Sequence, residues 1–127
     1  MSEYFTVSAR LKSFAHAVKG ILIMLKSQRN AWIHAAATII VCVMGLCFGV
    51  TKSEWCWIVL AIVVVWTAEA LNTALEFLMD AATPEYHPLV EKAKDVAAGA
   101  VLISAVGAAV IGLFIMGPYL LRLFGIV

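Results

Sequence analysis

The stretch WCWIVLAIVVVWTAEALNTALEFLMD, residues 55–80, changes character halfway along its length. Its first half is continuously apolar, and a helix needs about 20 such residues to cross the hydrocarbon core of a bilayer. Its second half places Glu69, Asn72, Glu76 and Asp80 at spacings of 3, 4 and 4, which is one face of an α-helix. The stretch therefore predicts a membrane-spanning helix with a polar stripe along one face near its end.

The depth of Glu69 in this helix argues for a function. It follows Trp55 by fourteen residues, which is about 21 Å along a helix and still inside the bilayer. An acid there costs on the order of 2.5–3.5 kcal/mol unless a partner, a metal or a proton compensates it. Emergence of the helix into water explains Asp80 alone but not Glu69. We therefore predict a site in which Glu69 suits a general base and Glu76 a ligand of a hard divalent cation.

The composition of the whole chain agrees with a membrane protein. The 127 residues are 64% hydrophobic and only 13% charged, which is more apolar surface than a soluble domain of this length can bury. Two further apolar segments, 31–50 and 96–119, are long enough to span a bilayer. We expect an all-α membrane protein with one domain over residues 1–127, transmembrane helices at 31–50, 55–80 and 96–119, and a polar loop at 81–95.

A further helix is predicted ahead of the first span, over about residues 8–28. Leu11, Phe14 and Val18 follow the spacing of one helical face, with Lys12 and Lys19 beside it. This pattern is typical of a helix that lies in the membrane interface with its lysines near lipid phosphates. Five of the nine Lys and Arg residues precede residue 30, so the segment and the 81–95 loop are predicted to share the cytoplasmic side.

Four motifs together resemble one family. They are RLKSFAHAVKG at 10–20, SQRNAWIH at 27–34, EALNTALEFLMD at 69–80 and TPEYHPLVEKAKDVAAGAVLISA at 83–105. They are similar to the prokaryotic diacylglycerol kinase/undecaprenol kinase family of small integral membrane lipid kinases, and closer to its undecaprenol kinase branch. The resemblance implies a homotrimer in the bacterial inner membrane, with its active site facing the cytoplasm. It implies transfer of the γ-phosphate of Mg²⁺-bound ATP to the hydroxyl of undecaprenol or diacylglycerol.

The resemblance also implies roles for residues of this chain. Glu69 would be the catalytic base and Glu76 a ligand of the ATP-bound Mg²⁺. Gln28 stands where the family commonly has a second metal-ligating acid, so weaker metal binding is expected. The nucleotide would be contacted by Arg10, His16, Asn72, Asp80, Glu85, Tyr86, His87, Lys94 and Asp95. The lipid substrate would lie near Glu69, Lys12, Lys19 and His34.

Other interpretations of the same residues stay open at this stage. His16 is also ordinary polar surface on an interfacial helix, and His34 could simply hydrogen-bond a neighbouring helix. A small proton-coupled transporter would use Glu69 as its proton site but would leave Asn72 and Glu76 without a role. A non-catalytic assembly protein would use the polar stripe only to pair helices. No feature of the sequence indicates a nucleic-acid partner.

Overall fold

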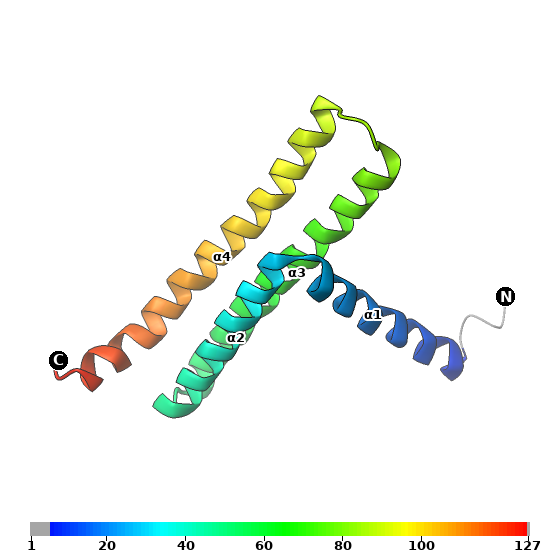
Figure 1. Ribbon diagram of the computed structural model, residues 1–127. Helices are drawn as coiled ribbons and strands as arrows, with labels where there is room; N and C mark the ends of the chain where they lie inside the picture. The colour runs from blue at the N-terminus through cyan, green and yellow to red at the C-terminus, as the bar shows by residue number, and fades with distance from the viewer. Residues whose placement is uncertain (1–5, 127) are drawn as a thin grey trace.

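The computed structural model describes residues 6–126, which form four α-helices and no strand within that range (Figure 1). The helices are α1 (Val7–Ser27), α2 (Arg29–Phe48), α3 (Lys52–Ala82) and α4 (Pro88–Leu123). The last three are long and apolar enough to cross a membrane. The predicted all-α fold class with three membrane-spanning helices is confirmed.

The third spanning helix begins earlier than its apolar segment, at Pro88 rather than near residue 96. His87 caps it, because its Nδ1 atom accepts a hydrogen bond of 3.2 Å from the backbone N–H of Leu89. Pro88 stands at the first helical position, where its missing N–H costs nothing. The predicted loop at 81–95 is therefore too long: only residues 83–87 separate the two helices, since the apolar pattern marks only the membrane part of α4.

Helix α1 stands apart from the other three. Thr6 caps its start, because the Thr6 hydroxyl accepts a hydrogen bond from the backbone N–H of Ala9. Only its last turns pack on α2 and α3, where Met24 is buried, and Figure 1 shows the rest running away from the bundle. Leu11 and Phe14 are exposed on it, which leaves an apolar face available to lipid. Its location in a membrane interface stays a prediction.

The end of the bundle opposite the polar stripe is closed by packing and hydrogen bonds. Gly49 adopts a left-handed conformation with φ of 64°, which allows α2 to end abruptly before the short turn into α3. Thr51 and Glu54 then form a reciprocal capping box at the start of α3. The Tyr119 hydroxyl of α4 donates to Oε2 of Glu54 over 2.9 Å, and the Tyr119 ring stacks on that of Phe48. The three spanning helices are thus joined at this end.

Candidate active site

The polar stripe of α3 is graded in exposure along the helix. Glu69 is completely buried at 0% exposure and Asn72 is buried at 5%. Glu76, two turns beyond Glu69, is half-buried, and Asp80 is exposed. Burial by the protein therefore decreases along this helix face from Glu69 to Asp80, and the predicted order of depth in the bilayer stays a prediction.

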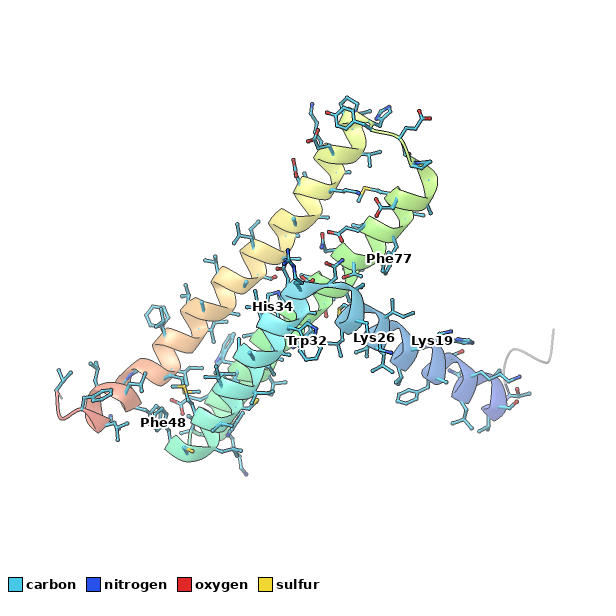
Figure 2. The ribbon with its side chains drawn as sticks, viewed as in Figure 1. Lys19, Lys26, Trp32, His34, Phe48 and Phe77 are labelled. Atoms are coloured by element: carbon cyan, nitrogen blue, oxygen red, sulfur yellow. The ribbon has the colours of Figure 1, made fainter. Side chains whose placement is uncertain are left out.

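The carboxylate of Glu69 faces His34 of α2. The Nε2 atom of His34 lies 3.6 Å from Oε2 of Glu69, and the imidazole is only 13% exposed; His34 is labelled in Figure 2. Among the side chains of residues 6–126, neither Glu69 carboxylate oxygen nor His34 Nε2 has a hydrogen-bond partner. A buried polar group without a partner is costly, so this pair is a candidate binding site for another polar group.

Two side chains that the sequence did not single out hold α2 against α3 beside His34. The indole N–H of Trp66 donates to the Thr38 hydroxyl over 3.1 Å, and that hydroxyl donates to the backbone carbonyl of His34 over 2.7 Å. The rings of Trp66 and His34 also meet edge to face, with centroids 6.4 Å apart. The sequence spacing could have pointed weakly to these two residues. Thr38 lies one turn after His34 and Trp66 nearly one turn before Glu69, so each shares a helix face with a predicted site residue.

The carboxylate of Glu76 is held by two side-chain amides. Gln28 Nε2 donates to Oε2 over 2.6 Å, and Asn72 Nδ2 donates to Oε1 over 3.2 Å. The start of α2 is thereby joined to the polar stripe of α3, and the predicted proximity of Gln28 and Glu76 is present. The buried Oδ1 atom of Asn72 has no hydrogen-bond partner within residues 6–126. The cluster offers one carboxylate and neutral carbonyl groups to a cation.

A polar pocket of about 350 Å³ lies where α3 and α4 meet the loop at residues 83–87. Lys94 of α4 forms an ion pair with Asp80 across it. The Tyr86 hydroxyl donates to Glu91 Oε2 over 2.7 Å, and this hydrogen bond to a carboxylate raises the pKa of the tyrosine. The pocket brings together six of the residues assigned to the nucleotide: Asp80, Glu85, Tyr86, His87, Lys94 and Asp95.

The residues predicted on α1 do not join this pocket within one chain. Arg10, Lys12, His16 and Lys19 are all exposed, and Figure 2 shows Lys19 on the part of α1 outside the bundle. In the described part of the chain, α1 contacts α2 and α3 but not α4. Their roles toward nucleotide and lipid stay predictions.

An apolar groove of about 350 Å³ lies between α2, α3 and α4. His34 and Thr38 are its polar lining residues, and the rest of the lining is aliphatic or glycine. Several of these are small, namely Ala37, Ala61, Ala105, Ala108 and Gly112. A Cβ atom placed on Gly112 would meet nothing within 4 Å, so the groove is open at that point. Glu69 lines neither cavity, but along α3 it lies between Val65, which lines the groove, and Asp80, which lines the polar pocket.

Comparison with known proteins gives this arrangement a context. The family model for prokaryotic diacylglycerol kinase matches residues 15–116. The chain is 43% identical to the undecaprenol kinase of Bacillus subtilis (strain 168), over 86% of this chain and 89% of that protein. It is 35% identical to the diacylglycerol kinase of Synechocystis sp. over 89% and 65%, and 30% identical to that of Escherichia coli K12 over 76% and 85%.

These relatives are all named kinases, and nothing in them favours a transporter or an assembly protein. The matched residues include Gln28, His34, the polar stripe and Lys94. A membrane-spanning fold whose buried acid lies along α3 between an apolar groove and a polar pocket also agrees with an enzyme that joins a lipid to a soluble reactant. The chain belongs to the prokaryotic diacylglycerol kinase family and is a bacterial membrane lipid kinase.

Proposed function

We propose that this enzyme transfers the γ-phosphoryl group of ATP to the hydroxyl of undecaprenol, giving undecaprenyl phosphate and ADP. One observation carries the proposal. Glu69 is fully buried on α3, and along that helix it lies between the residues that line the apolar groove and those that line the pocket with Lys94 and Asp95. The choice of undecaprenol over diacylglycerol is supported by the 43% identity to a protein named undecaprenol kinase.

In this proposal Glu69 is the general base. Its carboxylate takes the proton of the lipid hydroxyl while the oxygen of that hydroxyl forms a bond to the γ-phosphorus. The bond between the γ-phosphorus and the β–γ bridging oxygen breaks, and ADP leaves with the electron pair. A positioned general base contributes a factor of about 10²–10⁴ to such a step. The surrounding residues exclude water, which keeps the phosphoryl group for the lipid.

The nucleotide would occupy the polar pocket. Lys94 carries the positive charge suited to phosphate oxygens, and its partner Asp80 would release it when ATP binds. Asp95 and His87 line the same pocket and offer polar contacts to the sugar and phosphates. Arg10 and His16 lie on the far part of α1, so a role for them at a nucleotide would place them in a pocket of another subunit.

Magnesium is the metal that this reaction implies, and the residues around Glu76 fit it. No group of three or more His, Cys, Asp or Glu side chains gathers to hold a metal in residues 6–126, but Mg²⁺ in kinases is usually held by one or two carboxylates together with the phosphates. Glu76 supplies the carboxylate, and Asn72 and Gln28 carry amide oxygens that can serve as neutral ligands. When bound, the ion would neutralise charge on the phosphates.

The setting of the reaction completes the proposal. The excess of basic residues before residue 30 supports a cytoplasmic location for α1 and the polar pocket. An enzyme oriented in this way in the bacterial inner membrane would have access to cytoplasmic ATP.

We propose that the enzyme is a homotrimer. Ala100, Ser104, Ala108 and Gly112 recur every fourth residue on α4, and small residues at this spacing allow helices to approach closely in lipid.

A side-by-side assay of two acceptors tests the substrate. Purified protein in detergent micelles is given radiolabelled ATP and Mg²⁺ with either undecaprenol or diacylglycerol at matched mole fractions. We expect a higher kcat/KM with undecaprenol. A higher kcat/KM with diacylglycerol would reassign the substrate while leaving the kinase activity in place.

A further inference from the structure

Two contacts, about one helical turn apart, join α2 to α3 beside the buried acid. His34 Nε2 lies 3.6 Å from Oε2 of Glu69, and the Trp66 indole N–H donates to the Thr38 hydroxyl over 3.1 Å. Thr38 follows His34 by four residues on α2. Trp66 precedes Glu69 by three residues on α3, so the two contacts lie on the same pair of helix faces. The second contact therefore fixes how α2 is placed along α3 at the level of the first.

The Thr38 hydroxyl uses both of its hydrogen-bonding capacities in this contact. It accepts from the indole N–H and donates to the backbone carbonyl of His34 over 2.7 Å, as one hydroxyl can. These two hydrogen bonds form the Trp66–Thr38 link. The indole ring also meets the imidazole edge to face, with centroids 6.4 Å apart. Trp66 therefore holds the imidazole directly and the backbone of His34 through one hydroxyl.

Hydrogen bonds between spanning helices contribute strongly to their register. Both α2 and α3 are apolar enough to span a membrane, and lipid tails cover apolar faces as well as another helix does. Register then depends on close packing and on interhelical hydrogen bonds. A slip of one residue moves a helix by about 1.5 Å. A slip of that size would change the separation of His34 and Glu69 enough to decide whether they interact.

The carboxylate of Glu69 depends on this register. Neither of its oxygens has a hydrogen-bond partner within residues 6–126, and His34 is the one basic side chain in that range within 4.0 Å of them. Thr73, one turn further along α3, donates to the backbone carbonyl of Glu69 over 2.8 Å and so fixes the helix rather than the carboxylate. The imidazole is therefore the polar group placed to set the direction of the carboxylate.

We propose that Trp66 and Thr38 are positioning residues of this kinase. They hold the His34 imidazole opposite Glu69, and the imidazole keeps the carboxylate in the orientation that accepts the proton of the lipid hydroxyl. The proposal rests on the proposed function, since it concerns the base of the same reaction. In this role neither residue touches a reactant, so both affect the rate of the transfer step rather than the affinity for ATP or lipid.

Two variants of similar shape remove the link in steady-state kinetics with undecaprenol and ATP. Thr38→Val removes the hydroxyl but keeps the size of a side chain that also lines the apolar groove. Trp66→Phe removes the N–H group but keeps an aromatic ring. We expect each to lower kcat by about 10-fold and to keep both KM values within about twofold, since misplacement by 1 Å can cost about 100-fold in rate. Thr38→Ser, which keeps the hydroxyl, should restore most of the loss.

Trp57→Phe and Thr67→Val are the matched controls. Both residues lie on α3 and are exposed, and we expect both variants to keep the wild-type kcat. The double variant Thr38→Val/Trp66→Phe should lose no more than either single variant, because each substitution removes the same link. Losses that multiply in the double variant would show that the two side chains act independently and would overturn the proposal.

A measurement without turnover follows the imidazole itself. The chain has three histidines, so nuclear magnetic resonance of protein with isotope-labelled histidine gives few ring signals, and His34→Gln identifies those of His34. Thr38→Val leaves the Trp66 ring in place and changes how His34 is held. We expect it to shift the His34 signals, and we expect Thr38→Ser and Thr67→Val to leave them near their wild-type positions.

The outcomes separate this inference from the proposed function. If wild-type protein phosphorylates lipid, and Thr38→Val and Trp66→Phe lower only the unfolding temperature while kcat stays at the wild-type value, the link is structural and the inference is wrong. If wild-type protein phosphorylates no lipid, the proposed function fails, but shifted His34 signals in Thr38→Val still support the positioning of the imidazole. Unchanged His34 signals in Thr38→Val would overturn the inference in either case.

Discussion

Gln28 donates a 2.6 Å hydrogen bond to Glu76, which joins the first residue before α2 to the polar stripe of α3. The resemblance predicts a metal-ligating acid at this position, and this chain carries an amide there. The amide stabilises Glu76 without a metal, because a donor faces the carboxylate. A second acid would instead need a cation between the two groups.

Replacing Gln28 with glutamate tests this arrangement. Gln28→Glu should lower the Mg²⁺ concentration for half-maximal activity several-fold, because a second carboxylate adds charge for a hard cation. The same variant should unfold at a lower temperature than wild type in EDTA and regain that loss with Mg²⁺, since two carboxylates repel each other without it. Titration of activity and of thermal unfolding with Mg²⁺ measures both effects.

Gln28→Met is the control, because it removes the amide without adding charge. An unchanged or higher Mg²⁺ requirement in Gln28→Glu would count against a ligand role for position 28.

Removing the charge of Lys94 should weaken ATP binding. Lys94 forms an ion pair with Asp80 in the polar pocket, and a hydrogen bond to a charged group contributes about 1.5–3 kcal/mol. Lys94→Met should therefore raise the KM for ATP by about 10-fold or more with little change in the KM for lipid. Lys92→Met is the matched control, because Lys92 is exposed and does not line the pocket. An equal rise in the KM for ATP in both variants would contradict a specific role for Lys94, because it would show that ATP binding depends only on the overall charge of this region.

Gly45 should be intolerant of even a methyl group. A Cβ atom at this position would lie 2.9 Å from Cη2 and Cζ2 of the Trp55 ring, where the start of α3 packs on the end of α2. Gly45→Ala should destabilise the protein by about 1–3 kcal/mol, the usual cost of overpacking. Gly107→Ala is the control, since a Cβ there meets nothing within 4 Å and alanine favours a helix by up to about 1 kcal/mol. Thermal unfolding in detergent measures both, and a Gly45→Ala protein as stable as Gly107→Ala would contradict the close approach.

The sequence alone was sufficient to predict the helix that carries the site. Glu69, Asn72 and Glu76 share one face because helical geometry fixes the relation between residues three and four apart. Their decreasing burial depends on which neighbouring helices cover each residue, and the length of the apolar run does not predict it. The start of α4 was not predicted, because the polar turns from Pro88 onward carry no hydropathy signal, and their helical state depends on the cap at His87.

Contacts between helices were harder to anticipate. The approach of His34 to Glu69, and the hydrogen bond from Trp66 to Thr38, depend on how α2 crosses α3, and the spacing within one helix does not fix that crossing. The direction of α1 was equally beyond the sequence, since an amphipathic pattern predicts a helix with two faces but not the neighbour it meets. Trp66 and Thr38, which are joined by tertiary packing, were therefore missed, whereas Gln28 and His34 were assigned to the site through the resemblance to a family rather than through helical periodicity.

The central claim is that Glu69 activates the lipid hydroxyl, and the variant Glu69→Gln tests it most directly. The glutamine side chain has nearly the same size as the glutamate side chain but lacks the basic carboxylate. Purified wild-type and variant proteins in micelles are given radiolabelled ATP, Mg²⁺ and undecaprenol, and phosphorylated lipid is measured together with circular dichroism and oligomeric state. We predict turnover in wild type, a loss of at least about 100-fold in kcat for Glu69→Gln, and an unchanged fold and KM for ATP. A variant that keeps the wild-type kcat would contradict the account.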